Sequence, residues 1–270
     1  MRYLLHSVAL VLLITGACAR KQTTSSTRTT DSSTLRVLSY NVHHANPPAR
    51  PGVIDLDAIA AVIQREQPDV VMLQEIDVHT GRSGKTVDEA AELGRKTGLH
   101  AYFIKGIDYD GGEYGVALLS RLEMTNRRRI PLPTDSTTKG ERRVLGLATI
   151  QLPNKRAVTL ACTHLDAQKA PVNRHLQAAE IARILKQESQ PVILAGDFND
   201  YPDSETLRIL RTVVEPSCQA CPPTIPVENP KRTIDFVMFA PKTAFRVVEH
   251  RVIPERLASD HLPVLAVLAY

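Results

Sequence analysis

The sequence contains no tryptophan, and aromatic residues make up only 4% of its 270 residues. This scarcity argues against a stacking platform for single-stranded nucleic acid, because such platforms hold bases on aromatic side chains. A strong charge of either sign is also lacking. The formal net charge is +4, a bias too small to indicate a polyanionic partner by itself. We expect the densest basic run, Arg127-Arg128-Arg129, to be a solvated strand or loop.

The apolar run from Val8 to Ile14 is too short to span a bilayer and is followed by small residues, as in a signal peptide. The segment ITGAC, which ends at Cys18, resembles a bacterial lipobox, in which cleavage before the cysteine leaves it as the lipid-bearing N-terminus. Thr15 departs from the leucine usually found there, so plain secretion stays open as an alternative. We therefore expect residues 1–18 to be a lipoprotein-type signal peptide that ends at a lipidated Cys18.

Residues 19–34 are polar, low in complexity and rich in serine and threonine. Such a segment cannot bury enough apolar surface to fold. We expect it to be a disordered tether between a membrane and a domain that covers residues 35–270. The protein would then be exported and anchored by lipid to a membrane of a bacterial cell envelope, or be periplasmic or secreted if no lipid is attached.

Only three cysteines remain beyond the expected signal peptide. Cys218 and Cys221 form a CxxC motif in a proline-rich loop of an exported chain, where oxidising conditions favour a local disulfide over zinc binding or thiol redox chemistry. A four-cysteine zinc site would need a second such pair, which the sequence lacks. Cys162 lies in an apolar segment and is expected to be a small core residue.

Strand-like and helical patterns alternate from residue 35 onward, and the sequence shows no internal repeat. Helical patterns cover residues 55–66, 88–96 and 172–188. Strand-like runs cover residues 35–40, 70–74, 101–104, 114–120, 145–151, 157–163, 192–195, 233–239, 246–252 and 264–268. At least nine strands with three helices exceed what a simple doubly wound sheet uses. We therefore predict one α/β domain with two stacked sheets and helices on the outside.

Unusual polar residues follow several of the apolar runs. Asn41 follows LRVLSY, Glu75 follows VVMLQ, His164 follows VTLACT and Asp197 follows VILAG. We expect these strand ends to meet at one edge of the sheets. A carboxylate is exposed at such an edge, whereas in mid-strand it would be buried and unpaired at a considerable cost.

Residues two apart in an extended chain point to the same side. In GDFN, this rule sends Asp197 and Asn199 toward the site and Phe198 into the core. The same rule pairs Asn41 with His43, which we include among the candidate substrate-binding residues.

A hard cation such as Mg²⁺ prefers oxygen ligands, usually one or two carboxylates with water and substrate phosphate. Asn41, Glu75 and Asp260 supply such a set, which admits Mn²⁺ or Ca²⁺ as well. His261 would then be a general acid or base, because its ordinary pKa is close to neutral, and a carboxylate such as Asp235 would fix its tautomer. Each motif alone is modest evidence, since an aspartate or histidine in a loop is more often a cap or a surface group. Several such strand ends together indicate an active site.

The motifs LSYNVHH, LQE, THLD, GDFND, TIDFV and SDHLPV, in this order and approximate spacing, resemble those of the endonuclease/exonuclease/phosphatase superfamily. The superfamily includes pancreatic deoxyribonuclease, apurinic endonucleases, inositol-polyphosphate phosphatases and neutral sphingomyelinases. The resemblance runs from about residue 35 to residue 270. It implies a four-layer α/β sandwich, with two stacked mixed β-sheets flanked by helices, and in-line attack of water on phosphorus.

The resemblance also implies roles for the residues of the metal site and the attacking water. Glu75 resembles the principal metal ligand, with Asn41 and Asp260 beside it. Asp197 is similar to the carboxylate that orients or deprotonates the water, and Asn199 is similar to the side chain that holds a phosphate oxygen.

His261 with Asp235 resembles the paired base of the family, and His164 resembles the donor to the phosphoryl group. Two further stretches resemble bacterial exported members of the superfamily that are related to sphingomyelinase-like proteins. They are HTGRSGKTVDEAAELGRKTGLHAYF and GGEYGVALLSR. Arg82 and Arg174 are candidate ligands of the substrate phosphate.

We therefore expect a metal-dependent phosphoesterase that acts as a monomer on a phosphodiester or phosphomonoester, in a small molecule or a lipid headgroup. Apurinic endonucleases often continue the first asparagine with glycine, whereas Val42-His43-His44 follows it here, and no aromatic-rich wedge for DNA is visible. An extracellular nuclease is the first alternative. A catalytically inactive binding module at the cell surface is the second, which the filled catalytic positions disfavour.

Overall fold

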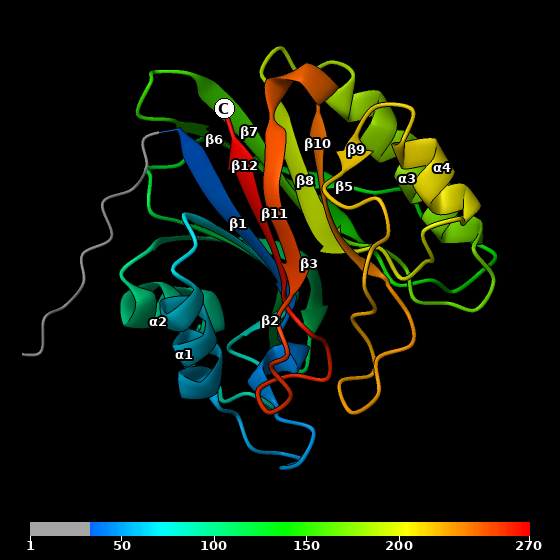
Figure 1. Ribbon diagram of the computed structural model, residues 1–270. Helices are drawn as coiled ribbons and strands as arrows, with labels where there is room; N and C mark the ends of the chain where they lie inside the picture. The colour runs from blue at the N-terminus through cyan, green and yellow to red at the C-terminus, as the bar shows by residue number, and fades with distance from the viewer. Residues whose placement is uncertain (1–32) are drawn as a thin grey trace, which may run out of the picture. The chain divides into compact units, whose positions relative to one another are not determined.

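The computed structural model describes residues 33–270 (Figure 1). The expected signal peptide, its lipidated Cys18 and nearly all of the expected tether lie outside the described residues. The first strand begins at Thr34, one residue before the expected domain boundary, and Thr34 pairs with Ala269. Within residues 33–270, no helix is long and apolar enough to cross a membrane.

Two six-stranded sheets form the centre of this domain. In spatial order, the first sheet consists of β11 (Arg246–Val252), β12 (Val264–Ala269), β1 (Thr34–Asn41), β2 (Val70–Val78), β4 (Gly112–Ser120) and β3 (His100–Tyr109). The second consists of β5 (Thr125–Pro131), β6 (Val144–Gln151), β7 (Ala157–His164), β8 (Val192–Asp197), β10 (Asp235–Ala240) and β9 (Glu215–Pro216). Both sheets are mixed, because β1 runs parallel to β2 and β7 runs parallel to β8, while their other neighbours are antiparallel.

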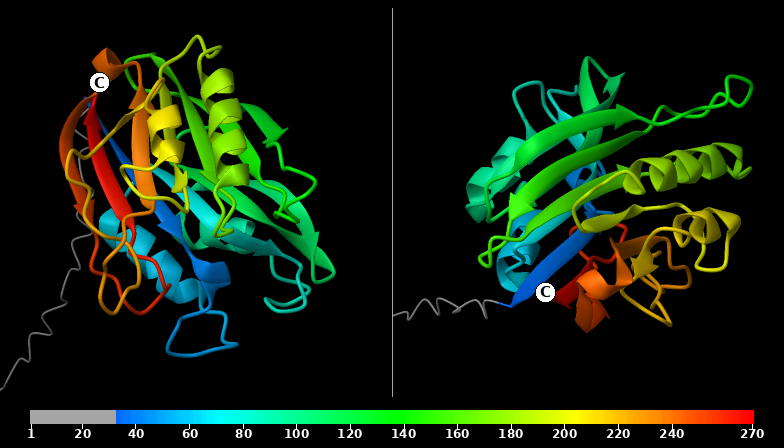
Figure 2. Two further views of the ribbon diagram at one scale, coloured as in Figure 1. Left: turned by 90° about the vertical axis from the view of Figure 1, so that its right-hand side faces the viewer. Right: turned by 90° about the horizontal axis from the view of Figure 1, so that it is seen from above.

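The helices lie on the two outer faces of the stacked sheets (Figures 1 and 2). The first sheet is covered by α1 (Leu56–Glu66) and α2 (Glu89–Thr97), and the second by α3 (Val172–Leu185) and α4 (Glu205–Leu210). Two 3₁₀ helices, η1 (His43–Ala45) and η2 (Lys242–Ala244), lie in connections. The predicted four-layer sandwich is confirmed.

Three hydrophobic cores hold the four layers together. Between the sheets, the first sheet contributes Met72 and Leu118 and the second contributes Leu160 and Val237, all fully buried. A second core joins the first sheet to α1 and α2, and a third joins the second sheet to α3 and α4. Burial of one such side chain contributes about 1.5–3 kcal/mol, so the inter-sheet core stabilises the packing of the two sheets.

Local signals set the helix boundaries. Asp55 caps α1 and Asp88 caps α2, each accepting a backbone N–H at 2.9 Å, from Ala58 and Ala91 respectively. Gly98 ends α2 with a left-handed φ of 70°.

The structure adds exposed or short elements that the sequence did not predict. β5 is an edge strand whose side chains are almost all exposed, so it carries no apolar alternation. It contains the arginine run Arg127-Arg128-Arg129, which was expected to be a solvated strand or loop. α4 has six residues, too few for a clear helical pattern. Cys218 and Cys221 form a disulfide bond, and Cys162 is buried in the inter-sheet core.

Candidate active site

Three of the predicted catalytic residues are neighbours in the second sheet. His164 ends β7 and Asp197 ends β8, and the two are cross-strand partners. Asp235 begins β10, the antiparallel neighbour of β8, and is the partner of Asp197 on its other side. Each is no more than 5% exposed. The register of the sheet therefore brings these side chains together.

Gly196 allows this close arrangement. A Cβ atom at this position would lie 2.0 Å from the carbonyl oxygen of Thr163 on the neighbouring strand. Any side chain would therefore push β8 away from β7 and separate Asp197 from His164.

The side-chain amide of Asn41 joins the two sheets. Its Nδ2 donates to Oε1 of Glu75 at 3.0 Å and to Oδ2 of Asp197 at 3.1 Å. Its Oδ1 accepts the backbone N–H of His43 at 3.1 Å, and a carbonyl oxygen keeps a second lone pair for a cation. Both amide hydrogens are thus used, and the orientation of the amide is fixed.

Glu75 lies at an irregularity inside β2, and the prediction that it follows the strand is wrong. The strand continues to Val78, and its register with β4 shifts between Gln74 and Ile76. Glu75 has a φ of 60°, a left-handed conformation that costs a residue other than glycine about 1–3 kcal/mol. The bulge takes the carboxylate out of the alternation of the strand and brings it to Asn41.

His44 faces Glu75, whereas the predicted His43 does not. Nδ1 of His44 lies 3.8 Å from Oε2 of Glu75, while Nδ1 of His43 lies 2.9 Å from the backbone carbonyl oxygen of Asn46. Both histidines have a positive φ within η1. The rule for extended chains, which singled out His43, therefore does not apply to this segment.

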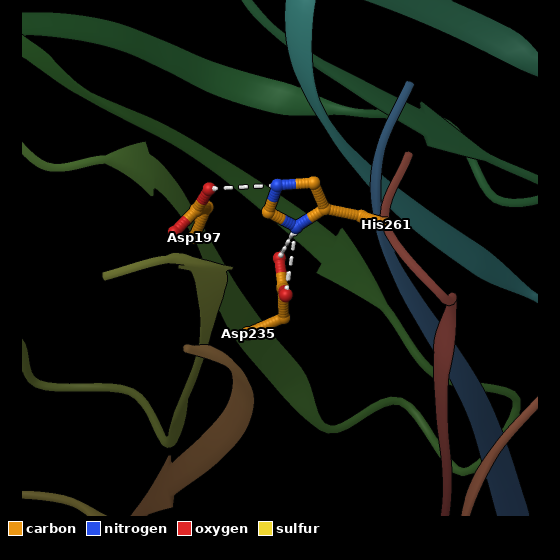
Figure 3. A group of neighbouring side chains, drawn as sticks. All are labelled: Asp197, Asp235 and His261. Carbon is orange, nitrogen blue, oxygen red and sulfur yellow. Dashed lines mark hydrogen bonds and ion pairs between the residues drawn. The ribbon is translucent and has the colours of Figure 1, made fainter. Parts of the chain in front are cut away.

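His261 lies between two carboxylates (Figure 3). Its Nδ1 is 2.9 and 3.1 Å from the two oxygens of Asp235, and its Nε2 is 3.7 Å from Oδ2 of Asp197. His261 comes from the loop before β12, which is tied to the first sheet by Ser259. The hydroxyl of Ser259 donates to the backbone carbonyl of Asn41 at 2.7 Å.

The charges of this group depend on one another. Burial alone would lower the pKa of His261, but the charges of Asp235 and Asp197 outweigh it and raise the pKa to about 10. Burial, with the charge of Asp235, raises the pKa of Asp197 to about 7. At neutral pH, His261 is therefore protonated and Asp197 is near its own pKa, the condition that suits a general base.

Asn199 orients His164. Its Nδ2 lies 3.0 Å from Nε2 of His164 and 3.0 Å from the backbone carbonyl oxygen of Leu165. Because an amide nitrogen only donates, Nε2 accepts, and the neutral ring carries its proton on Nδ1. Burial lowers the pKa of His164 well below its usual value, which keeps the ring neutral. Nδ1 is buried and has no partner within residues 33–270, so it is available as a donor.

A tight turn, rather than an extended strand, brings Asn199 to His164. Asn199 has a φ of 51° and donates its backbone N–H to Oδ1 of Asp197 at 2.8 Å. Phe198 points into the core beneath α3 and α4, as predicted, with its ring centroid 5.7 Å from that of Phe236.

The predicted metal ligands offer oxygen donors only. Glu75 is in contact with Asn41, and Asp260 follows the residue that ties its loop to Asn41. Burial would raise the pKa of Glu75, but the nearby His44 and the hydrogen bond from Asn41 hold it well below its usual range. The carboxylate is therefore ionised at neutral pH, and the donor set fits a hard divalent cation.

A buried Asp/Asp/His group offers a second set of donor atoms. Ligand atoms of Asp197, Asp235 and His261 lie within 4.8 Å of one another. Asp235, however, already accepts the Nδ1 proton of His261. This contact suits proton handling, and it leaves the oxygen set around Glu75 as the better fit for a cation.

Both predicted phosphate-binding arginines are paired with aspartates. Arg82 donates through Nε and Nη2 to Asp77 at 2.7 and 2.9 Å and lies 4.4 Å from the ring centroid of Tyr109. Arg174 is 6% exposed and is held by Asp200 and by two backbone carbonyl groups. Their charges are used within the fold, so a substrate phosphate would have to displace an aspartate.

Arg143 lies beside His164, although the sequence did not single it out. It is 8% exposed and lines a small pocket together with Tyr114, Val116 and His164. After burial, its charge is the main cause that lowers the pKa of His164. In the sequence, the run Glu141-Arg142-Arg143 before an apolar strand has the form of an ordinary surface charge pattern.

The sequence of this chain matches a known protein family and a curated bacterial relative. Residues 38–261 match the model of the Endonuclease/Exonuclease/phosphatase family. The chain is 24% identical over 245 residues to the uncharacterized protein YbhP of Escherichia coli (strain K12), a match that covers 86% of this chain and 95% of YbhP.

Solved structures share the fold. One is an endonuclease/exonuclease/phosphatase from Beutenbergia cavernae, with a TM-score of 0.76 and 28% identity, covering 88% of this chain and 72% of that one. Another is a mannosyl-6-phosphatase from Bacteroides thetaiotaomicron, with a TM-score of 0.71 and 19% identity, covering 87% of this chain and all (100%) of that one.

Proposed function

The chain belongs to the endonuclease/exonuclease/phosphatase family, whose members are phosphoesterase hydrolases, and from this premise we propose that it is a divalent-metal-dependent phosphoesterase. Its substrate is a phosphodiester or phosphomonoester in a small molecule or a lipid headgroup. The observation that carries the proposal is the position of Asp197. This carboxylate contacts Asn41, a proposed metal ligand, and lies within 4 Å of both His164 and His261.

Asp197 takes a proton from the attacking water. Because Asp235 keeps His261 protonated, Asp197 is the acceptor left in this group, and its pKa of about 7 suits the task. The imidazolium of His261, 3.7 Å away, then stabilises the charge that Asp197 carries between turnovers. The bond between water oxygen and phosphorus forms as the ester bond on the opposite side breaks. The departing oxygen takes a proton from solvent, and Asp197 releases its proton to solvent before the next turnover.

His164 donates from Nδ1 to a phosphoryl oxygen. Asn199 supports this role by holding Nε2, since both hydrogens of its amide are used by His164 and by the carbonyl of Leu165. The expectation that Asn199 itself holds the phosphate is therefore replaced by a positioning role. A divalent cation held by Asn41, Glu75 and Asp260 would neutralise the charge that develops on the phosphoryl oxygens. We propose Mg²⁺ as this cation, with Mn²⁺ or Ca²⁺ as alternatives.

Export and lipid anchoring complete the proposal, and they rest on the sequence of residues 1–18 alone. A lipidated Cys18 would place the site outside the cytoplasm, close to a membrane surface. Labelling with a radioactive fatty acid in a bacterial host should mark the wild-type protein and leave Cys18→Ser unlabelled.

Hydrolysis of bis-p-nitrophenyl phosphate tests the enzymatic part of the proposal. We expect turnover with Mg²⁺, loss of turnover with a chelator, and recovery when Mg²⁺ is restored. Glu75→Ala and His261→Ala should each lower the rate at least a hundredfold while the circular dichroism spectrum is retained. Glu123→Ala removes an exposed carboxylate just after β4, whose end pairs with the start of β2 and so lies away from Glu75, and it should keep the wild-type rate. Full activity of either site variant would contradict the assignment.

Assays of the same protein on several substrates distinguish between the substrate classes. We expect release of phosphorylated headgroups from lipid vesicles, or of phosphate from sugar or inositol phosphates, with Glu75→Ala as the blank. Rapid digestion of plasmid DNA without these activities would instead support a nuclease. Inertness toward every ester would support a binding module.

A further inference from the structure

We propose that Arg143, together with Arg142 and Tyr114, forms a subsite for a second anionic group of the substrate, next to the phosphoryl group that water attacks. The inference rests on the proposed phosphoesterase function and deepens it by naming a substrate class. That class consists of phosphate esters that carry a further phosphate or carboxylate group.

Arg143 is a buried cation with unused hydrogen-bonding capacity. Its side chain is 9% exposed, and its Nη1 lies 2.9 Å from Oε1 of Glu141, which is itself 40% exposed. Its Nε is buried and has no partner within residues 33–270. A buried donor without a partner is unfavourable, and the planar guanidinium fork matches phosphate and carboxylate oxygens. An anion at this position would satisfy the group.

The guanidinium forms part of a pocket that reaches the candidate active site. The same pocket is lined by Tyr114, Val116 and His164, and His164 is the proposed donor to the phosphoryl group. The pocket has room for about one water-sized group. It therefore admits a single anionic oxygen, and the rest of the second anionic group has to lie outside it.

A larger groove adjoins the pocket and supplies that space. The two share Gly106, Glu141, Arg142 and Arg143. The groove has a volume of about 640 Å³ and runs between β3 and the segment before β6. Its charged lining consists of Lys105, Arg129, Arg142, Arg143, Asp108 and Glu141.

Cations predominate in this groove, and they differ in how far they are already bound. Arg129 donates to the backbone carbonyl groups of Lys105 and Gly106. Lys105 is paired with Asp108 at 2.6 Å and with Glu113 at 2.8 Å. Arg142 is exposed and makes no hydrogen bond or ion pair within the described part of the chain. Arg142 and Arg143 both line the pocket and the groove, so we place the second anionic group where the two meet, within reach of both arginines.

The subsite predicts that the protein binds phosphate esters with a second anionic group more tightly than esters without one. Inhibition of bis-p-nitrophenyl phosphate hydrolysis measures this difference in the full-length protein, with Mg²⁺ kept in excess over the inhibitor. We expect fructose 1,6-bisphosphate to inhibit the wild type at concentrations at least tenfold lower than fructose 6-phosphate. The ratio of the two inhibition constants should fall below about threefold in Arg143→Met and in Arg142→Met. The ratio cancels any common loss of basal rate.

The matched control is Arg121→Met, which removes an exposed arginine that is paired with Asp69 on another part of the surface and should retain the wild-type ratio. The inhibition constant of 6-phosphogluconate, which carries a carboxylate in place of the second phosphate, shows which of the two anions the subsite binds more tightly. If Arg143→Met does not fold, the ratio of inhibition constants in Arg142→Met, which changes an exposed residue, tests the subsite instead.

A wild-type ratio near one, or an unchanged ratio in the variants, would overturn the subsite and leave the phosphoesterase function standing. Absence of any wild-type hydrolysis would overturn the phosphoesterase function itself.

Discussion

Replacing Glu89 with glutamine should change how the stability of the protein depends on pH. Glu89 begins α2 and is fully buried. Its Oε2 accepts the backbone N–H of Asp77 at 2.9 Å, whereas its Oε1 has no partner among the described residues. Burial is the main reason that the pKa of Glu89 rises from 4.5 to about 8, with a smaller contribution from the charge of Asp77.

Between these two pKa values, the folded protein keeps a proton on Glu89 that the unfolded chain has released. The folded state thus binds more protons, so the free energy of unfolding falls as the pH rises through this range. The stabilising contribution is complete below about pH 4.5 and lost above about pH 8. At about 1.4 kcal/mol per pKa unit, the loss reaches at most about 3 kcal/mol at pH 7 and about 5 kcal/mol at pH 9.

Urea denaturation at about pH 5, 7 and 9 measures this effect. Between pH 5 and pH 9, wild type should lose up to about 4 kcal/mol more than Glu89→Gln. Glu92→Gln, in the same helix, is the control: hydrogen bonding to Arg95 lowers the pKa of Glu92 to about 2, so its carboxylate is ionised throughout. An equal difference between wild type and Glu89→Gln at all three pH values would refute the reasoning, because Glu89 would then be ionised in the folded protein as well.

Two further substitutions test the geometry of the site. Gly196→Ala should lower the free energy of unfolding by about 1–3 kcal/mol or more, because the added Cβ would lie 2.0 Å from the carbonyl oxygen of Thr163; a denaturation midpoint equal to that of wild type would contradict this close approach. Asp235→Asn should lower the pKa of His261, since burial would then act with less opposing charge. The alkaline limb of the pH–rate profile should move to lower pH and the rate at neutral pH should fall, whereas an unchanged profile would show that Asp235 does not control the imidazole.

Apolar periodicity was sufficient to predict the layers of the fold. The central strands and the first three helices bury one or both faces, and burial imposes a pattern on the residues in the chain. β5 lies at an edge with both faces largely exposed, so nothing constrains its side chains to alternate. Such strands form because a neighbouring strand offers backbone hydrogen bonds. Their own side chains show no apolar alternation from which a strand could be predicted.

The candidate site was predictable where it depended on strand ends and failed where it depended on backbone conformation. Asn41, His164 and Asp197 lie at the ends of their strands as expected. The positive φ of Glu75 and of His44 decides which side chains meet, and residue types such as these give no sign of a left-handed backbone.

Arginines posed a different difficulty. Arg82 and Arg174 were selected as phosphate ligands, yet each has an aspartate partner within the fold, while Arg143 has an unused donor. Which arginine keeps free hydrogen-bonding capacity depends on the three-dimensional neighbours of each guanidinium. The sequence cannot rank them.

The amide of Asn41 has a consequence for when the protein can act. Asn41 belongs to the first sheet and donates a hydrogen bond to Asp197 of the second. Neither sheet therefore contains a complete candidate active site by itself. Catalysis should therefore require both sheets to be packed against each other, and a loosening between them that breaks this hydrogen bond should abolish it. A chain in which the two sheets have not yet packed together would therefore hydrolyse no ester.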